Sequence, residues 1–285
     1  MPLTTRFAPS PTGYLHLGHA YSALLAYEAA RAHGGRFLLR IEDIDPIRCR
    51  PEYSDAMLED LRWLGLTWEE PVRRQSEHMD DYAAALAKLR SMGFLYPCFC
   101  TRREIEKEVM AAAAAPHLAA QGPDGPVYPG TCRTLDPDER AQRLRRNEAA
   151  SWRLDTAKAI AITGPLDWND RVAGRVKAAP LNFGDAVLAR KDVPASYHLS
   201  VTVDDHLQHV GLVTRGKDLF RATDVHRLLQ ALLGYTAPDY HHHVLLTDAT
   251  GRRLAKREGA MTLRALRAAG KTAAEVRQMA ARAGT

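Results

Sequence analysis

The segment from Arg6 to His19, Arg-Phe-Ala-Pro-Ser-Pro-Thr-Gly-Tyr-Leu-His-Leu-Gly-His, constrains the fold of this chain more than any other stretch. The residues before it are enough for one strand, and residues 20–33 are helix formers with apolar side chains at helical spacing that end at Gly34-Gly35. A mostly apolar run at 37–41 then suits a buried parallel strand. The pattern predicts a strand, a turn, a helix and a second strand, which is the start of an α/β sheet.

The turn has the composition of a phosphate-binding site. Pro9 and Pro11 keep it out of regular structure, and Gly18 allows a ligand to approach where the helix begins. A helix N-terminus favours anions, and His16 and His19 are placed to add donors beside it. Two histidines three residues apart can also simply cap a helix, and the pair alone leaves both roles open.

The complete fourteen-residue string resembles the signature of the class I aminoacyl-tRNA synthetases, with residues 16–19 at the "HIGH" motif. Its first eight residues are similar to the bacterial glutamyl branch of that family. The resemblance implies that His16, Gly18 and His19 bind ATP and that the two histidines serve catalysis. It also implies a Rossmann-like α/β catalytic domain.

Two further motifs carry the resemblance into an amino-acid pocket. Glu42-Asp43-Ile44-Asp45 follows the second strand at the sheet edge where α/β folds bind ligands, and it resembles the family's Arg-Ile-Glu-Asp-Thr-Asp. By that match Glu42 holds the ammonium group of the substrate. The acidic residues could instead cap the helix that begins near Pro51.

The segments 195–205 and 210–218 return the chain to the sheet and resemble the family's Tyr-x-x-Ala-x-x-x-Asp-Asp and Val-x-Arg-Gly-x-Asp. The match implies that Tyr197 and Arg215 line a pocket for L-glutamate. A diacid needs guanidinium groups for its carboxylates, which Arg6 and Arg215 can supply. Ala8 and Ser10 then complete the shape of the pocket.

Three cysteines and a tyrosine form a candidate metal site. Cys98 and Cys100 are one residue apart, and Cys132 follows after a long insertion; three thiols can hold a tetrahedral zinc, although buried free thiols are the alternative. The arrangement Cys-x-Cys and Tyr-x-x-x-Cys resembles the site of a shorter relative of the glutamyl-tRNA synthetases, in which the tyrosine, here Tyr128, is a ligand. We expect one structural zinc per chain, with His117 as a competitor for the fourth position.

Residues 251–260 resemble the "KMSKS" loop in its glutamyl form. Arg253 stands where the family has its first lysine, Ala255 replaces the serine, and Lys256 keeps the second cation. The resemblance implies that Lys256 and Arg253 contact the triphosphate of ATP, which is bound with Mg²⁺.

The expected organisation is a catalytic domain in two halves, 1–95 and 189–250, interrupted by a small α+β zinc-containing insertion at 96–188. Short strands are predicted at 151–154 and 160–162 within that insertion. Residues 251–285 hold the loop and a short helical tail with one helix, and we expect no anticodon-binding domain.

Charge and apolar patterning restrict the partners. The formal net charge is +5, of which residues 251–285 contribute +7 and the rest −2, so the tail suits a polyanion or a solvated helix. No apolar run approaches eighteen residues and no signal peptide is visible, which predicts a cytoplasmic protein without membrane contact. Four cysteines in such a chain favour thiols or metal over disulfides. We expect a monomer.

The resemblance to the shorter relative implies a two-step reaction. L-glutamate is activated by ATP to glutamyl-adenylate without tRNA, and it is then transferred to queuosine at the wobble position of tRNA(Asp). The alternatives are a reduced glutamyl-tRNA synthetase that charges tRNA(Glu), a nucleotidyltransferase of the same superfold, and a non-catalytic paralogue that only binds tRNA.

Overall fold

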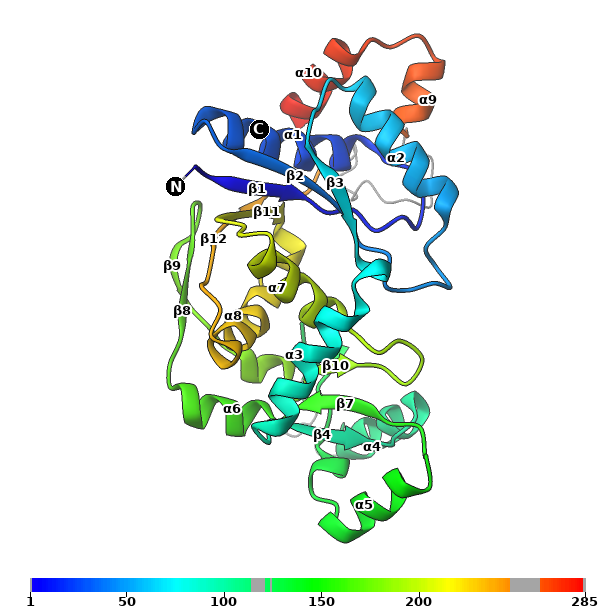
Figure 1. Ribbon diagram of the computed structural model, residues 1–285, viewed down its shortest axis with the longest axis vertical. Coiled ribbons are helices and arrows are strands. Elements are labelled where there is room, and N and C mark those ends of the chain that lie inside the picture. The colour runs from blue at the N-terminus through cyan, green and yellow to red at the C-terminus, as the bar shows by residue number, and fades with distance from the viewer. Residues whose placement is uncertain (1, 114–120, 124, 247–261, 284–285) are drawn as a thin grey trace.

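A seven-stranded sheet forms the centre of the catalytic part in the computed structural model, which describes residues 2–113, 121–123, 125–246 and 262–283 (Figure 1). The strand order is β3-β2-β1-β11-β12-β8-β9, and neighbouring strands are parallel except β8 and β9. The strands are β1 (Thr4–Phe7), β2 (Arg36–Ile41), β3 (Glu69–Arg74), β8 (Asp167–Asp170), β9 (Gly174–Lys177), β11 (Leu212–Gly216) and β12 (Asp239–His243). The predicted strand–turn–helix–strand start is confirmed, because β1 pairs with β2 in parallel.

Helices cover both faces of this sheet (Figure 1). On one face lie α1, α2, α9 and α10. The buried alanines and tyrosine of α1 share a core with Phe7, Phe37 and Leu39 of the sheet. On the other face α3, α7 and α8 share a second core. These helices are α1 (Leu17–Ala32), α2 (Pro51–Trp63), α3 (Met79–Ser91), α7 (Tyr197–Leu207), α8 (Ala222–Leu233), α9 (Leu263–Ala268) and α10 (Ala273–Ala283).

A smaller antiparallel sheet lies at the lower end of the molecule (Figure 1). Its order is β10-β7-β4, with β4 (Leu95–Cys98), β7 (Ser151–Leu154) and β10 (Val187–Ala189). The other elements of this region are α4 (Arg102–Ala113), β5 (Gln121–Gly122), β6 (Gly125–Pro126), α5 (Pro137–Arg145) and α6 (Thr156–Thr163). The predicted strand at 151–154 is confirmed.

The main sheet extends into the range expected for the insertion. β8 pairs in parallel with β12, with Asp170 opposite Tyr240, and β9 forms the antiparallel edge. Trp168 supplies the reason, because it is buried in a small core with Val213 and Tyr240 of the sheet. Residues 167–177 therefore belong structurally with the catalytic sheet.

The predicted strand at 160–162 is wrong, because these residues lie in α6. Asp155 caps that helix by accepting a hydrogen bond from the Lys158 N–H at 3.1 Å, and Thr156 and Ala159 are its buried residues. The short apolar run Ile160-Ala161-Ile162 is typical of a strand, but Ile162 is 70% exposed. The strand prediction assumed that all three side chains are buried, and the exposure of Ile162 contradicts that assumption.

Two other segments also differ from expectation. The return to the sheet is made by β11, whereas residues 197–207 form α7, whose first turn is capped by Ser196. The single C-terminal helix is two helices, since Gly270 adopts φ +80° after α9. Glycine favours this left-handed conformation, which ends a helix.

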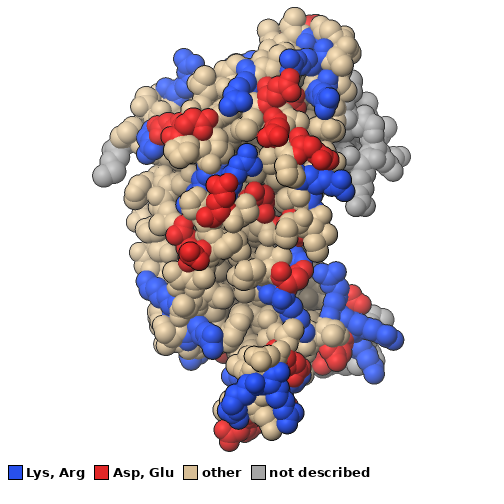
Figure 2. Space-filling model, turned by 45° about the vertical axis from the view of Figure 1, so that its right-hand side comes forward, with Lys and Arg blue, Asp and Glu red and all other residues tan. Residues whose placement is uncertain are grey.

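Positive charge also gathers away from the tail. Figure 2 shows Lys and Arg side chains over the lower end of the molecule, where α5 lies. This helix carries Arg140, Arg143 and Arg145 and has no buried residue. In the described part of the chain, no helix is long and apolar enough to cross a membrane.

The carboxyl group of Asp60 in α2 generates a prediction about stability. It is 3% exposed, and its Oδ2 has no hydrogen-bond partner. Burial, with a smaller contribution from Glu59, raises its pKa to about 6. The pKa of Asp60 is higher in the folded state than in the unfolded state. The free energy of unfolding therefore decreases as the pH rises from about 4 to 6 and Asp60 ionises.

We therefore expect Asp60→Asn to stabilise the protein by about 1–3 kcal/mol at pH 8 and by less than about 1 kcal/mol near pH 4. Urea denaturation across this pH range measures the difference. Asp55→Asn, at an exposed position of the same helix, is the control and should show no such trend. A constant effect of Asp60→Asn at all pH values would contradict the prediction.

Candidate active site

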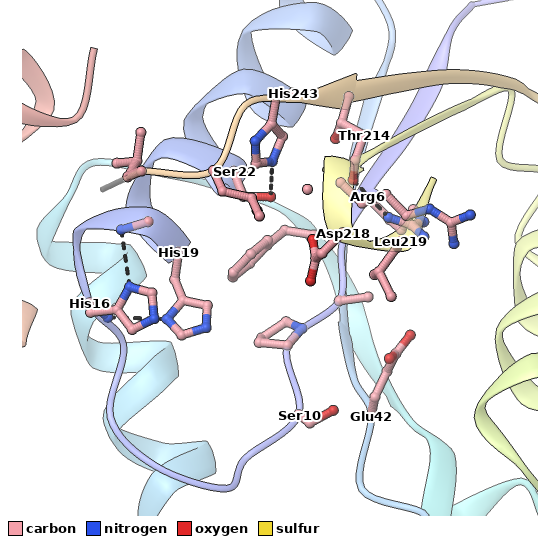
Figure 3. Close-up of a pocket in the computed structure, with 18 of the residues that line it drawn as sticks. Arg6, Ser10, His16, His19, Ser22, Glu42, Thr214, Asp218, Leu219 and His243 are labelled. Carbon is pink, nitrogen blue, oxygen red and sulfur yellow. Dashed lines mark hydrogen bonds between the residues drawn. The ribbon is translucent and has the colours of Figure 1, made fainter. Parts of the chain in front are cut away.

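A cavity of about 540 Å³ opens at the carboxyl ends of β1, β11 and β12 (Figure 3). This edge is where open α/β sheets bind ligands. All the sequence-predicted glutamate and ATP residues that the structure describes line this one cavity. They are Arg6, Ala8, Ser10, His16, Gly18, His19, Glu42, Tyr197 and Arg215.

His16 and His19 cap α1 and at the same time line the cavity. The Gly18 N–H donates to His16 Nδ1 at 3.1 Å, and the His16 N–H donates to His19 Nδ1 at 3.1 Å. The two rings lie face to face at a tilt, with centroids 3.8 Å apart. Because each Nδ1 accepts a hydrogen bond, a neutral ring carries its proton on Nε2. Both rings are thereby held as Nε2–H donors.

A glycine at position 18 is favoured by local packing as well as by the approach of a ligand. A Cβ at this position would lie 3.0 Å from Cε1 of the His16 ring, which is tighter than ordinary contact. A side chain here would press against the ring that caps the helix. The glycine thus preserves the arrangement of the two histidines.

The segment with the predicted phosphate cations lies outside the described residues. This applies to Arg253, Ala255 and Lys256, and likewise to His117. The residues on either side of 247–261 are described: Leu246 lines the cavity, and Thr262 forms a β-bridge with His16. Leu263 continues this attachment, since its N–H donates to the Leu15 carbonyl at 2.8 Å.

A buried network of charged side chains lies beneath the residues that are predicted to bind glutamate. Arg40 is fully buried and donates to Asp205 at 2.9 Å and to Glu42 at 3.2 Å, and its Nε lies 3.5 Å from Asp204. Arg6 donates from Nε to Asp205 at 3.0 Å. Buried charges need partners of this kind, because desolvating an unpaired ion costs several kcal/mol.

The network sets the protonation of its acids. Burial would raise the pKa of Asp205, but Arg6 and Arg40 hold it below its ordinary value. For Glu42 burial prevails, and its pKa is raised despite Arg40 and Arg6. Glu42 therefore gains from any further cation in the cavity, such as an ammonium group.

The second arginine of the cavity has a different environment. Arg215 is 5% exposed and donates to His242 Nε2 at 3.0 Å, to Tyr197 Oη at 3.2 Å and to Thr223 Oγ1 at 2.6 Å. Among the described residues, no carboxylate forms an ion pair with it. We therefore expect it to attract an anionic ligand.

Sequence reasoning missed several residues that line the cavity, among them Ser22, Asp218 and His243. His243 Nε2 accepts a hydrogen bond from Ser22 Oγ at 3.0 Å (Figure 3). His243 is the last of three adjacent histidines, residues 241–243, at the end of β12. Their position at the end of a strand beside β11 was the available signal, because strand ends at this edge face the ligand.

The predicted zinc ligands that the structure describes come together near β4 of the smaller sheet. The Sγ atoms of Cys98, Cys100 and Cys132 all lie within 4.8 Å of one another. Tyr128 Oη is 3.5 Å from Cys100 Sγ and accepts a hydrogen bond from the Cys132 N–H at 2.8 Å. Three sulfurs and a phenol this close have the composition and spacing that a tetrahedral metal with soft ligands requires.

The thiols of this cluster differ in acidity. Burial raises the pKa of Cys100 to about 12. At Cys132 burial also raises the pKa, but hydrogen bonds from Tyr128 and the Phe99 N–H outweigh it and lower the pKa below its usual value. Cys132 is thus the more acidic of these two thiols.

The fold and the cavity together define an α/β protein with a ligand-sized cavity at the carboxyl edge of a parallel sheet. The family model for the catalytic domain of class I tRNA synthetases (E and Q) matches residues 2–285. The chain belongs to this family of class I aminoacyl-tRNA synthetases, which confirms the resemblance drawn from the sequence and rejects the nucleotidyltransferase alternative.

Individual relatives fall within the glutamyl group. The glutamyl-Q tRNA(Asp) synthetase of Rhodobacter capsulatus is 49% identical over 97% of this chain and 99% of its own. Glutamate–tRNA ligase 2 of Cereibacter sphaeroides is 37% identical over 100% of this chain and 62% of its own. A crystal structure of a glutamate tRNA ligase from Elizabethkingia meningosepticum, in complex with its amino acid, superposes with a TM-score of 0.77 at 29% identity. It covers 91% of this chain and 53% of its own.

Proposed function

We propose that the chain activates L-glutamate with ATP, without tRNA, and transfers it to queuosine in tRNA(Asp). The observation that carries the first step is the single cavity in which an anion-binding helix start meets a carboxylate-binding arginine. His16 and His19 lie at one side, and Arg215 and Glu42 lie at the other. ATP and a small zwitterion can therefore be held together.

In the proposed first step, an α-carboxylate oxygen of glutamate attacks the α-phosphorus of ATP. The bond from that phosphorus to the oxygen bridging the β-phosphate breaks, and pyrophosphate leaves. No protein nucleophile takes part. Catalysis rests on positioning and on stabilising charge at the phosphates.

The residues of this chain have distinct roles in that step. The Nε2–H groups of His16 and His19 donate to phosphate oxygens without carrying a charge themselves. Arg253 and Lys256 offset the charge of the triphosphate, and Mg²⁺ bound with ATP would offset more of it. Arg215 takes a carboxylate of glutamate, and Glu42 takes its ammonium group.

In the proposed second step, a hydroxyl of the modified base attacks the carbonyl carbon of the adenylate, and AMP leaves. The 49% identity to a glutamyl-Q tRNA(Asp) synthetase, over nearly the whole length of both chains, supports this acceptor. A second cavity of about 270 Å³ shares Ser10, Glu42 and Tyr197 with the first, which leaves room for an acceptor beside the activated glutamate.

The decisive experiment is glutamate-dependent ATP–pyrophosphate exchange without tRNA, followed by transfer of labelled glutamate. We expect exchange without tRNA and transfer only to tRNA(Asp) that contains queuosine. Queuosine-free tRNA(Asp) and tRNA(Glu) are the controls. Transfer to tRNA(Glu) would favour the reduced glutamyl-tRNA synthetase, and tRNA binding without any exchange would favour the non-catalytic paralogue.

Lys256→Ala tests the triphosphate contact. We expect it to lower the exchange rate by about 10²–10³-fold while glutamate binding is retained, because charge stabilisation at the transition state is lost. Lys271→Ala removes an equal charge from the tail, where Lys271 is paired with Glu275, and should leave exchange unchanged. Normal turnover of Lys256→Ala would remove this residue from the mechanism.

We also propose that Cys98, Cys100, Cys132 and Tyr128 hold one structural zinc. The spacing of the three sulfurs and the phenol supports this assignment. The metal would tie the end of β4 to the turn at Cys132. None of these four residues lines the 540 Å³ cavity, so the metal would maintain structure.

Metal analysis of the purified protein should find about one zinc per chain. Cys132→Ala should lose the zinc and lower the melting temperature, because the metal contributes folding energy. Cys49→Ala is the matched control, since Cys49 lies outside the cluster, and it should keep the metal. Equal zinc content in the two variants would exclude the proposed ligands.

A further inference from the structure

The guanidinium group of Arg215 is held entirely by neutral acceptors. Besides the bonds to Tyr197, Thr223 and His242, its Nη1 lies 3.2 Å from His226 Nδ1. Burial and the charge of Arg215 lower the pKa of His242 to about 4 and that of His226 well below its usual value. Both rings are therefore uncharged at neutral pH, and they orient the arginine without neutralising it.

Asp170 fixes the ring of His242 from behind. Its Oδ2 lies 2.7 Å from His242 Nδ1 and also accepts the His242 backbone N–H at 3.1 Å. Since an ionised carboxylate accepts only, the ring proton is on Nδ1. Nε2 then presents its lone pair to Arg215 Nε. The opposite tautomer would bring two N–H groups together.

Asp170 is itself anchored independently of the cavity. Its Oδ1 accepts the N–H groups of Val172 and Ala173 at 2.9 and 2.8 Å, in the turn between β8 and β9. The side chains of Asp170 and His242 are each 1% exposed. The pair is thus a rigid support that connects the edge of the main sheet to the substrate arginine.

Comparison with Arg6 shows what this support provides. Arg6 lines the same cavity, but its Nε and Nη2 are directed to Asp205. A directly attached carboxylate neutralises the guanidinium and occupies its fork. At Arg215 the carboxylate of Asp170 acts through the imidazole ring of His242. The arginine is held in place while its charge remains available to an anion.

We propose that Asp170 and His242 are positioning residues that hold Arg215, with its charge uncompensated, for a carboxylate of the substrate. The inference rests on the proposed function, because it takes glutamate as that substrate. The arrangement favours a carboxylate over an amide: a buried, uncompensated guanidinium gains a charge-assisted bond from the acid and leaves a charge unpaired beside the amide. Selection of glutamate over glutamine then depends on residues that do not touch the substrate.

Variants of His242 provide the test. His242→Phe keeps the ring volume and removes the acceptor, and we expect it to raise the KM for glutamate by about 10–100-fold while the KM for ATP changes by less than about 3-fold. His242→Gln places Oε1 near the position of Nε2, and it should restore most of the glutamate affinity. Asp170→Asn should weaken the binding of glutamate, because it reverses the tautomer preference of the His242 ring.

The matched control is His241→Phe. His241 is the preceding residue of the same strand, so its side chain points to the opposite face, and this variant should leave both KM values unchanged. Exchange kinetics are measured with glutamate and glutamine, together with calorimetric glutamate binding and the melting temperature. We expect the preference for glutamate to shrink in His242→Phe and to recover in His242→Gln.

Two outcomes overturn the inference alone. In one, the wild type exchanges with glutamate but His242→Phe and His241→Phe have the same glutamate KM. In the other, His242→Phe and His242→Gln lose kcat and melting temperature equally while the KM for glutamate does not change, as a merely structural role predicts. A wild type that neither binds glutamate nor supports exchange would instead overturn the proposed function, and this inference with it.

Discussion

The fully buried guanidinium group of Arg40 connects the elements on which the cavity depends. From β2 it reaches Asp204 and Asp205 of α7 and Glu42 at the exit of its own strand. Asp204 also accepts hydrogen bonds from Arg73 of β3, from Gln75 and from Tyr82 of α3. Removing one partner from such a network typically costs about 3–5 kcal/mol, so β2, β3, α3 and α7 hold their relative positions strongly.

This network gives the two arginines of the cavity different electrostatic roles. Asp205 is shared between Arg40 and Arg6, so the charge of Arg6 is largely compensated within the protein. Arg215 lies on the next strand, yet its partners are two imidazoles and two hydroxyls. For an anion in the cavity, the guanidinium of Arg6 therefore contributes mainly to the shape of the cavity. The guanidinium of Arg215 has a charge that the anion can neutralise.

Local patterns in the sequence predicted the parts of the fold that are themselves local. The β1–α1–β2 start follows from spacing and glycine stops, and the motifs collected nine residues that the structure places in one cavity. The supporting residues had no such signal: Asp170 and His242 are 72 positions apart, and their contact exists only because β8 joins the sheet beside β12. Hydrophobic periodicity predicts which face of a strand is buried, but it does not pair the polar side chains buried across strands.

The histidine motif shows that structural and functional interpretations of a residue need not compete. The pair alone allowed either a helix cap or a ligand donor, and the geometry makes the first the condition for the second. Capping consumes the Nδ1 lone pairs of His16 and His19, which leaves each neutral ring with an Nε2–H group. An uncapped histidine could adopt the other tautomer and offer a lone pair to a phosphate oxygen, which would repel it. In the proposed binding of ATP, the cap therefore determines whether these rings attract or repel a phosphate oxygen.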